Sequence, residues 1–192
     1  MLDSSNGYEA VAAQYIASRS RVGAAAVRAW AQSLPRGASI LDLGCGHGVP
    51  VTEVLLATGC HVYAVDASPS LISAFRRRFA DVPVACEAAD TSSFFDRRLD
   101  GIVAWGLMFL LPPAAQHRVI TNVSLALTPG GTFLFTAPAQ SCTWTDVLTG
   151  QPSTSLGAPA YHDLLAQASL VVQEEGDDEG GNHFYVAKKS SA

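Results

Sequence analysis

A turn rich in glycine follows the apolar run Ser39–Leu43, and its glycines stand at alternate positions, Gly44, Gly46 and Gly48. An amphipathic stretch comes next, so the segment predicts a strand, a glycine turn and a helix, the junction where doubly wound α/β folds bind nucleotide-like ligands. A dinucleotide fingerprint needs a glycine where Val49 stands. Asp42 would repel a pyrophosphate but attract an ammonium or sulfonium group. Both features argue against an NAD-linked oxidoreductase.

The pattern Asp42-x-Gly44-x-Gly46-x-Gly48 resembles motif I of the class I S-adenosylmethionine-dependent methyltransferases, acidic-x-Gly-x-Gly-x-Gly. The resemblance covers the chain from about Tyr8 to Lys189. It implies an α/β fold with a Rossmann-like, doubly wound, seven-stranded sheet, mostly parallel with an antiparallel C-terminal hairpin. It also implies S-adenosyl-L-methionine as the cofactor and S-adenosyl-L-homocysteine as the product.

The resemblance assigns residues to the parts of that cofactor. Asp66, with Ala67 beside it, ends the strand predicted at 61–65, where Rossmann-like folds place an acidic residue on the ribose hydroxyls; a helix-capping aspartate is the alternative. Asp90 would bind the adenine amino group, with Thr91 as a weaker candidate. The methionine end is assigned Asp42 and the glycine loop with Cys45, and an N-terminal helix would cover it with Tyr15 and Arg19.

Trp105 follows the strand predicted at 99–105 and would form the floor between cofactor and substrate, unless it is a core residue. The substrate side is expected where the loop after the strand at 132–137 and the final hairpin turn reach the carboxyl ends of the parallel strands. Its candidates are Trp144, Asp146 and Asn182, with Tyr8 from the first helix. His183 is the candidate general base, since a histidine pKa lies near neutral pH; a structural histidine is the alternative. Tyr161 and His162 are further candidates.

The elements that must position these residues follow from periodicity and turn chemistry. Helices are predicted from Tyr8, over 22–34, 49–57, 68–79, 112–127 and 160–168. Strands are predicted at 39–43, 61–65, 82–86, 99–105 and 132–137, and 170–174 with 184–188 form a closing hairpin. The polar stretch 141–159 is predicted to be a loop or lid. We expect one domain over 1–192, with an N-terminal helical cover (1–35) on a Rossmann-like core (36–192).

Composition and charge argue against several classes of function. The chain has 192 residues, 48% hydrophobic and 15% charged, and a net charge of −5 with no basic stripe, which argues against a nucleic-acid substrate. No apolar run is long enough for a membrane span, and the N-terminal residues lack a signal pattern, so we expect a cytoplasmic protein without membrane contact. The four cysteines are widely spaced, and no metal site is expected.

The resemblance implies methyl transfer from S-adenosylmethionine, and the charge and motif arguments favour the nitrogen, oxygen or sulfur of a small molecule as the acceptor. The segment Ala104–Phe109 lacks the Asn/Asp-Pro-Pro-Tyr motif of enzymes that methylate the amino groups of nucleic acids. A binding protein of the same fold, which holds S-adenosylmethionine or S-adenosylhomocysteine without turnover, is the alternative. We expect a monomer or a homodimer.

Overall fold

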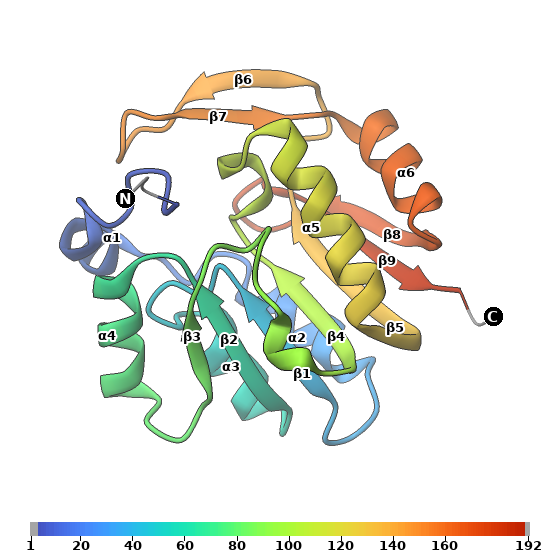
Figure 1. Cartoon of the computed structure of the whole chain (residues 1–192), viewed down its shortest axis with the longest axis horizontal. Helices are drawn as coiled ribbons and strands as arrows, with labels where there is room; N and C mark the ends of the chain where they lie inside the picture. Colours follow the sequence, from blue (N-terminus) through green and yellow to red (C-terminus); the bar gives the residue numbers. More distant parts are fainter. Residues whose placement is uncertain (1–3, 191–192) are drawn as a thin grey trace.

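The computed structural model describes residues 4–190, and its centre is a seven-stranded sheet (Figure 1). The strand order is β3-β2-β1-β4-β5-β9-β8. Neighbours from β3 to β5 pair in parallel, and β9 runs antiparallel to both β5 and β8. The bounds are β1 (Ser39–Leu43), β2 (His61–Asp66), β3 (Val84–Cys86), β4 (Leu99–Ala104), β5 (Leu127–Thr136), β8 (Leu170–Asp177) and β9 (His183–Lys189). This topology confirms the predicted Rossmann-like fold class.

Helices cover both faces of this sheet (Figure 1). They are α1 (Ala12–Ser18), α2 (Ala24–Gln32), α3 (Val51–Ala57), α4 (Pro69–Arg78), α5 (Pro113–Ala126) and α6 (Ala158–Gln167), with short 3₁₀ turns η1 (Phe94–Asp96) and η2 (Met108–Leu110). The start of α4 follows the sequence signal, because the Ser68 hydroxyl accepts the Leu71 N–H at 3.2 Å and Pro69 occupies the first turn. None of the helices within 4–190 is long and apolar enough to cross a membrane.

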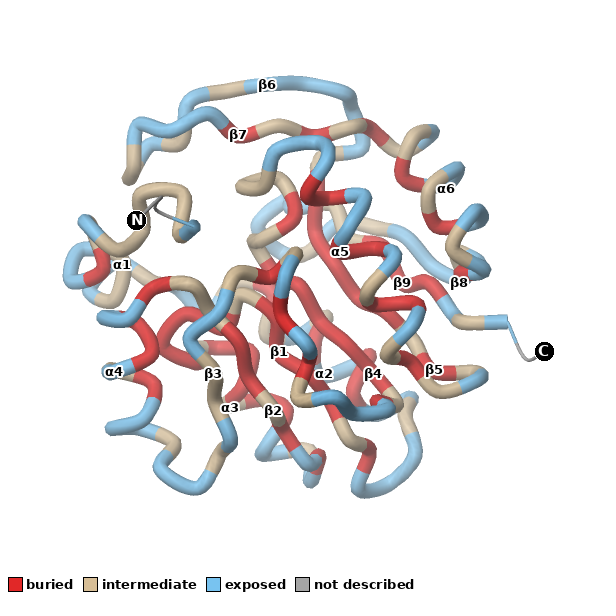
Figure 2. The backbone as a smooth tube through the Cα atoms, in the orientation of Figure 1, coloured by how far each residue is buried: buried red, intermediate tan, exposed pale blue. Residues whose placement is uncertain are grey.

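The core forms on both faces because successive residues of a strand point in opposite directions. In β1, Ile40 packs toward α2 and α3, whereas Leu41 and Leu43 pack toward α5 and α6. In β5, Leu134 lies on the α2 side and Phe133 and Phe135 on the other. The central strands are therefore buried along most of their length (Figure 2).

A second, two-stranded antiparallel sheet of β6 (Cys142–Thr145) and β7 (Pro152–Ser155) lies above the end of the main sheet (Figure 1). The sequence predicted only a loop or lid over 141–159. The hairpin escaped prediction because its strands, CTWT and PSTS, are short and mostly polar. Of the two, β6 is largely exposed (Figure 2). We call the hairpin and its turn, residues 142–155, the lid hairpin.

Gln116 of α5 fastens the lid hairpin to the domain. Its side chain is fully buried, its amide donates to the carbonyl oxygens of Leu111 and Thr154 at 2.9 Å each, and its oxygen accepts the Tyr161 hydroxyl at 2.7 Å. One glutamine thus joins α5, β7 and α6.

We expect Gln116→Ala to destabilise the protein by about 3 kcal/mol, because it creates a cavity and removes one hydrogen-bond partner each from the Tyr161 hydroxyl and the carbonyl oxygens of Leu111 and Thr154. The corresponding fall in Tm is about 6–12 °C for a protein of this size. Differential scanning calorimetry would measure it, with Gln173→Ala as the control. Gln173 is exposed on β8, so its loss should cost less than about 0.5 kcal/mol. Equal effects of the two variants would contradict the anchoring role.

Candidate functional site

A cavity of about 450 Å³ opens at the carboxyl ends of β1, β2 and β4. The strand order reverses between β1 and β4, and ligands bind at such switch points in open α/β sheets. The N-terminal segment and the lid hairpin meet over this end of the sheet. Residues from several separate segments line the cavity: Ser4–Asn6 with Tyr8; Tyr15 and Ser18–Ser20; Gly44 and Gly46; Val65–Ala67 with Leu71; Glu87 and Ala89; Trp105–Leu107 with Phe109–Leu111; Asp146–Leu148; and Asn182.

The glycine turn lets the backbone approach the cavity closely. Gly44 and Gly46 have φ values of +75° and +56°, a region that side chains rarely adopt. A Cβ on Gly46 would lie 3.1 Å from the Tyr15 ring, and one on Gly44 would lie 3.0 Å from Leu107. The predicted glycine positions therefore fit tightly under the first helix and the loop after β4. Gly48 and Cys45 lie in the same turn but outside the cavity lining, and burial raises the pKa of the Cys45 thiol.

Asp66 sits at the end of β2 and faces both the turn and the cavity. Its Oδ2 accepts the N–H of Gly46 at 2.8 Å, and its Oδ1 accepts the N–H of Ser68 at 2.9 Å. Burial raises the pKa of this carboxyl, and the two backbone donors oppose the rise because they favour the ionised form. The structure thus holds a carboxylate, with Ala67 next to it, at the predicted ribose position.

Asp42 is buried under the turn rather than in the cavity wall. Its Oδ2 accepts the Thr52 hydroxyl at 2.6 Å, and its side chain is not among those that line the cavity. Burial raises the pKa of Asp42 to about 7, and the hydrogen bond from Thr52 limits the rise. Asp42 therefore titrates near neutral pH instead of standing as a permanent negative charge beside a ligand.

This shift predicts a pH dependence of stability. The folded state holds a proton on Asp42 between the ordinary pKa of 3.8 and the folded value of about 7, so the unfolding free energy falls as pH rises through that window. We expect Asp42→Asn to gain stability relative to the parent protein between about pH 4 and pH 7, and the difference to level off above. Urea unfolding of both proteins across this range measures it. A difference that is constant with pH would contradict the raised pKa.

The adenine end of the predicted site differs from the expectation. Asp90 lies outside the cavity lining, because its carboxylate pairs with Arg118 of α5 at 2.6 Å and its carbonyl oxygen accepts from Asn122. Thr91 is exposed and also outside the lining. Glu87 and Ala89 line the cavity instead. Glu87 is the first residue after β3, so the rule that parallel strands present ligands at their carboxyl ends could have found it.

Arg19 and Tyr15 lie at the opposite end of the glycine turn. The Arg19 guanidinium is 5.7 Å from the centroid of the Tyr15 ring, and its Nε donates to the Val49 carbonyl oxygen at 3.3 Å. Both side chains line the cavity, as the sequence predicted. A guanidinium held by a ring and a backbone carbonyl is available to bind a carboxylate.

Trp105 forms a rigid wall of the cavity and is also a core residue, so both readings of its sequence position apply. Its indole packs against Gly23, where an added Cβ would lie 2.3 Å from the ring, and against Phe184. Gly23 in turn donates its N–H to Glu179 in the β8–β9 turn at 3.0 Å. Gly23, the Trp105 indole and the β8–β9 hairpin thus pack against one another.

The lid hairpin reaches the N-terminal segment through Asp146. Its Oδ2 accepts the Tyr8 hydroxyl at 3.2 Å, and burial and this carboxylate together raise the pKa of Tyr8. Tyr8 and Asp146 line the cavity. Trp144 does not, but its ring packs on that of Phe109, with centroids 5.4 Å apart, and so supports the wall from behind. Glu9, next to Tyr8, accepts from the Ser70 hydroxyl at the start of α4 at 2.6 Å.

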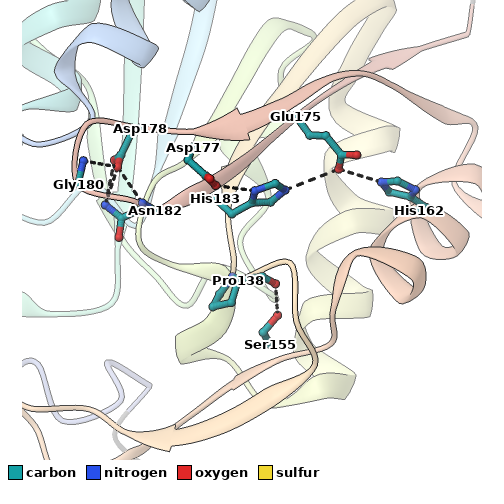
Figure 3. Close-up of polar contacts among 9 residues, drawn as sticks. All are labelled: Pro138, Ser155, His162, Glu175, Asp177, Asp178, Gly180, Asn182 and His183. Carbon is teal, nitrogen blue, oxygen red and sulfur yellow. Dashed lines mark hydrogen bonds and ion pairs between the residues drawn. The ribbon is translucent and has the colours of Figure 1, made fainter.

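His183 is not among the residues that line the cavity, and it lies in a row of acidic and basic groups (Figure 3). Its Nδ1 contacts Asp177 at 2.8 Å, and Glu175 lies between it and His162. The structure therefore does not bring the predicted base to the cavity lining, because His183 starts β9 and its ring pairs with its cross-strand partner Asp177 of β8. Asn182, one residue earlier, lines the cavity, while its amide donates to Asp178 (Figure 3).

The cavity residues that sequence reasoning missed include Glu87, Ala89, Leu71, Val147 and Leu148, and the apolar group Leu107 and Phe109–Leu111. The apolar residues escaped prediction because an apolar cavity wall has the same sequence pattern as a packed core. Within 4–190, no cluster of three or more histidine, cysteine or acidic side chains is arranged to hold a metal ion.

Comparison with known proteins shows what this core is similar to. Residues 40–131, just under half of the chain, match a family model described as a methyltransferase domain. The match spans the glycine turn, Asp66 and Glu87, so it contains most of the cavity floor.

A curated relative matches about half of the chain. The carboxy-S-adenosyl-L-methionine synthase of Yersinia pestis (strain Pestoides F) is 31% identical over 99 residues, which are 48% of this chain and 37% of that protein. The chain therefore matches little more than a third of the length of such relatives.

Solved structures of methyltransferases share the fold at low sequence identity. The 1,6-didemethyltoxoflavin-N1-methyltransferase of Burkholderia thailandensis, crystallised with its substrate and S-adenosylhomocysteine, superimposes with a TM-score of 0.73 at 20% identity, over 99% of this chain and 92% of that one. An amino pentose methyltransferase of Micromonospora echinaspora gives a TM-score of 0.73 at 18% identity, over 95% and 96%. The chain thus shares its fold with these methyltransferases.

Proposed function

We propose that this protein transfers a methyl group from S-adenosyl-L-methionine to a nitrogen, oxygen or sulfur atom of a small molecule. The observation that carries the proposal is a chain of contacts along the cavity. Arg19 lies over the Tyr15 ring, which packs on Gly46, and Gly46 donates its N–H to Asp66. The N–H of Glu87 in turn donates to the Asp66 carbonyl oxygen at 3.0 Å. This is the order of carboxylate, methionine chain, ribose and adenine in the cofactor.

The residues fit that cofactor chemically. Gly44 and Gly46 leave room that a Cβ would fill, and the Arg19 guanidinium matches the methionine carboxylate. Asp66 can accept hydrogen bonds from ribose hydroxyls, and Glu87 can accept from the adenine amino group. Leu71 and Ala89 supply apolar contact for the adenine faces. The family match to a methyltransferase domain supports the same assignment.

When bound, S-adenosylmethionine supplies an activated methyl group on a sulfonium centre. The protein's part is then to hold the acceptor in line and to exclude water, and such positioning can contribute roughly 7–11 kcal/mol to a rate enhancement. Trp105, fixed between Gly23 and Phe184, provides a rigid wall. The contacts of Tyr8 and Glu9 close the cavity from the N-terminal side.

Calorimetric titration with S-adenosylmethionine and S-adenosylhomocysteine tests the proposal. We expect both to bind with dissociation constants near the micromolar range, about −8 kcal/mol. Transfer of labelled methyl groups to a panel of phenols, amines and thiols then tests turnover. Binding without turnover of any acceptor would favour the non-catalytic binding protein, and absence of binding by folded protein would overturn both readings.

A further inference from the structure

One region of the cavity makes none of the proposed contacts with the cofactor. It lies between the lid hairpin and η2 and is lined by Phe109, Leu110, Leu111 and Leu148, with Asp146 and Val147 at the lid turn. Among residues 4–190, four charged residues line the cavity: Arg19, Asp66 and Glu87 belong to the proposed cofactor contacts, and Asp146 belongs to this region. Within the described residues the region thus combines apolar side chains with one carboxylate, which the Tyr8 hydroxyl borders.

The two carboxylate oxygens of Asp146 have different hydrogen-bond partners. Its Oδ1 accepts from the N–H groups of Leu148 and Thr149, at 2.9 and 2.8 Å, and from the Thr149 hydroxyl at 3.1 Å. Among residues 4–190, its Oδ2 receives only the Tyr8 hydroxyl, at 3.2 Å. A carboxylate oxygen has room for two donors, so Oδ2 retains acceptor capacity at the cavity wall. The bonds to Oδ1 fix the side chain in the lid turn and thereby fix the place of Oδ2.

Val147, the next residue, is 98% exposed although it lines the same cavity. A large apolar side chain at a cavity mouth gains free energy when a ligand removes it from water. The lid turn thus presents an apolar surface and a hydrogen-bond acceptor side by side, both available to one molecule.

We propose that this region is the acceptor-substrate subsite and that it selects an uncharged aromatic compound with a hydroxyl or amino group, which donates to Oδ2 of Asp146 while its ring packs against Val147 and Phe109. The inference rests on the proposed function, since it takes the rest of the cavity as the cofactor site. A carboxylate at this place disfavours anionic compounds and those whose hydroxyl is blocked as an ether.

The test measures binding to protein saturated with S-adenosylhomocysteine, by equilibrium dialysis of three fluorescent probes: β-naphthol, its methyl ether and β-naphthoate. We expect β-naphthol to bind at least about tenfold more tightly than the ether, because a hydrogen bond to a charged acceptor is lost in the ether. We expect β-naphthoate to bind more weakly than β-naphthol by a similar factor, through repulsion by Asp146.

Three variants test the role of the Asp146 Oδ2 atom separately from that of the lid turn. Asp146→Asn can keep an oxygen toward Leu148 and Thr149 but places an amide N–H₂ at the Oδ2 position, so the preference for β-naphthol over its ether should fall below about threefold. Thr149→Val removes one bond to Oδ1 and weakens the turn, yet should keep the preference. Val147→Ser should weaken β-naphthol and the ether by the same factor and leave their ratio unchanged.

Equal affinities of β-naphthol and its ether in the parent protein would overturn this assignment, as would a preference that persists in Asp146→Asn. Failure of all three probes to bind the protein loaded with S-adenosylhomocysteine would also overturn it. Failure of S-adenosylhomocysteine itself to bind would instead overturn the proposed function, so the two failures are distinguishable.

Discussion

Asp66→Ala is expected to weaken S-adenosylhomocysteine binding by at least about a hundredfold, close to 3 kcal/mol. The variant removes the charged acceptor for the ribose hydroxyls, and each such hydrogen bond contributes about 1.5–3 kcal/mol. It also deprives the N–H groups of Gly46 and Ser68 of their partner, which loosens the glycine turn. Isothermal titration calorimetry of the parent and variant, each first shown to be folded by circular dichroism, measures the loss.

Asp90→Asn is the matched control for this prediction. The structure pairs Asp90 with Arg118 on the α5 side, at 2.6 Å, whereas Glu87 lines the cavity. A surface ion pair contributes only about 0–1 kcal/mol to stability, so affinity for S-adenosylhomocysteine should stay within about twofold. Glu87→Gln should weaken binding measurably. A loss in Asp90→Asn as large as that in Asp66→Ala would return Asp90 to the cofactor site and contradict the geometry.

Gly23→Ala is expected to lower stability by about 3 kcal/mol, from about 1–2 kcal/mol for the left-handed backbone and about 1–3 kcal/mol for overpacking. Gly23 has a φ of +87°, and its added Cβ would lie 2.3 Å from the Trp105 indole. The Tm should fall by about 6–12 °C. Because Trp105 is a cavity wall, S-adenosylhomocysteine affinity should fall as well.

Gly59→Ala is the control that separates backbone strain from crowding around the added methyl group. Gly59 has a φ of +81°, nearly that of Gly23, but nothing lies within 4 Å of its added Cβ. Only the backbone cost of about 1–2 kcal/mol applies there, and ligand affinity should not change. Scanning calorimetry and the same titration serve both variants. If Gly23→Ala and Gly59→Ala proved equally stable and bound equally well, Trp105 would not be fixed by the linker as the structure has it.

The glycine turn shows what short-range pattern can predict. An apolar strand followed by Gly44, Gly46 and Gly48 needs positive φ values, and each of the three has one. The chemistry of the turn is contained in residues next to one another, so the sequence predicted the place of the turn and the position of Asp66 at the end of β2. The order of strands and helices followed for the same reason, because hydrophobic periodicity is local.

Asp90 and His183 show where that reasoning ends. Both follow or begin strands at the expected end of the sheet, so the sequence placed them at the site. Asp90 lies in the turn after β3 and pairs with Arg118 of α5, and His183 pairs with Asp177 of β8, so contacts between separate segments of the chain engage both side chains outside the cavity lining. Glu87 and Asn182, their near neighbours in the chain, line the cavity instead.

By itself the sequence determined the order of strands and helices and the glycine turn with Asp66 downstream, because local propensity, periodicity and turn chemistry specify them. Only the tertiary structure decided that Asp90 pairs with Arg118, that Gly23 must be glycine to admit Trp105, and that a polar hairpin closes the cavity through Tyr8 and Asp146. Those features depend on contacts between residues far apart in the chain, such as the hydrogen bond from Tyr8 to Asp146, and a sequence pattern carries no signal for such pairs.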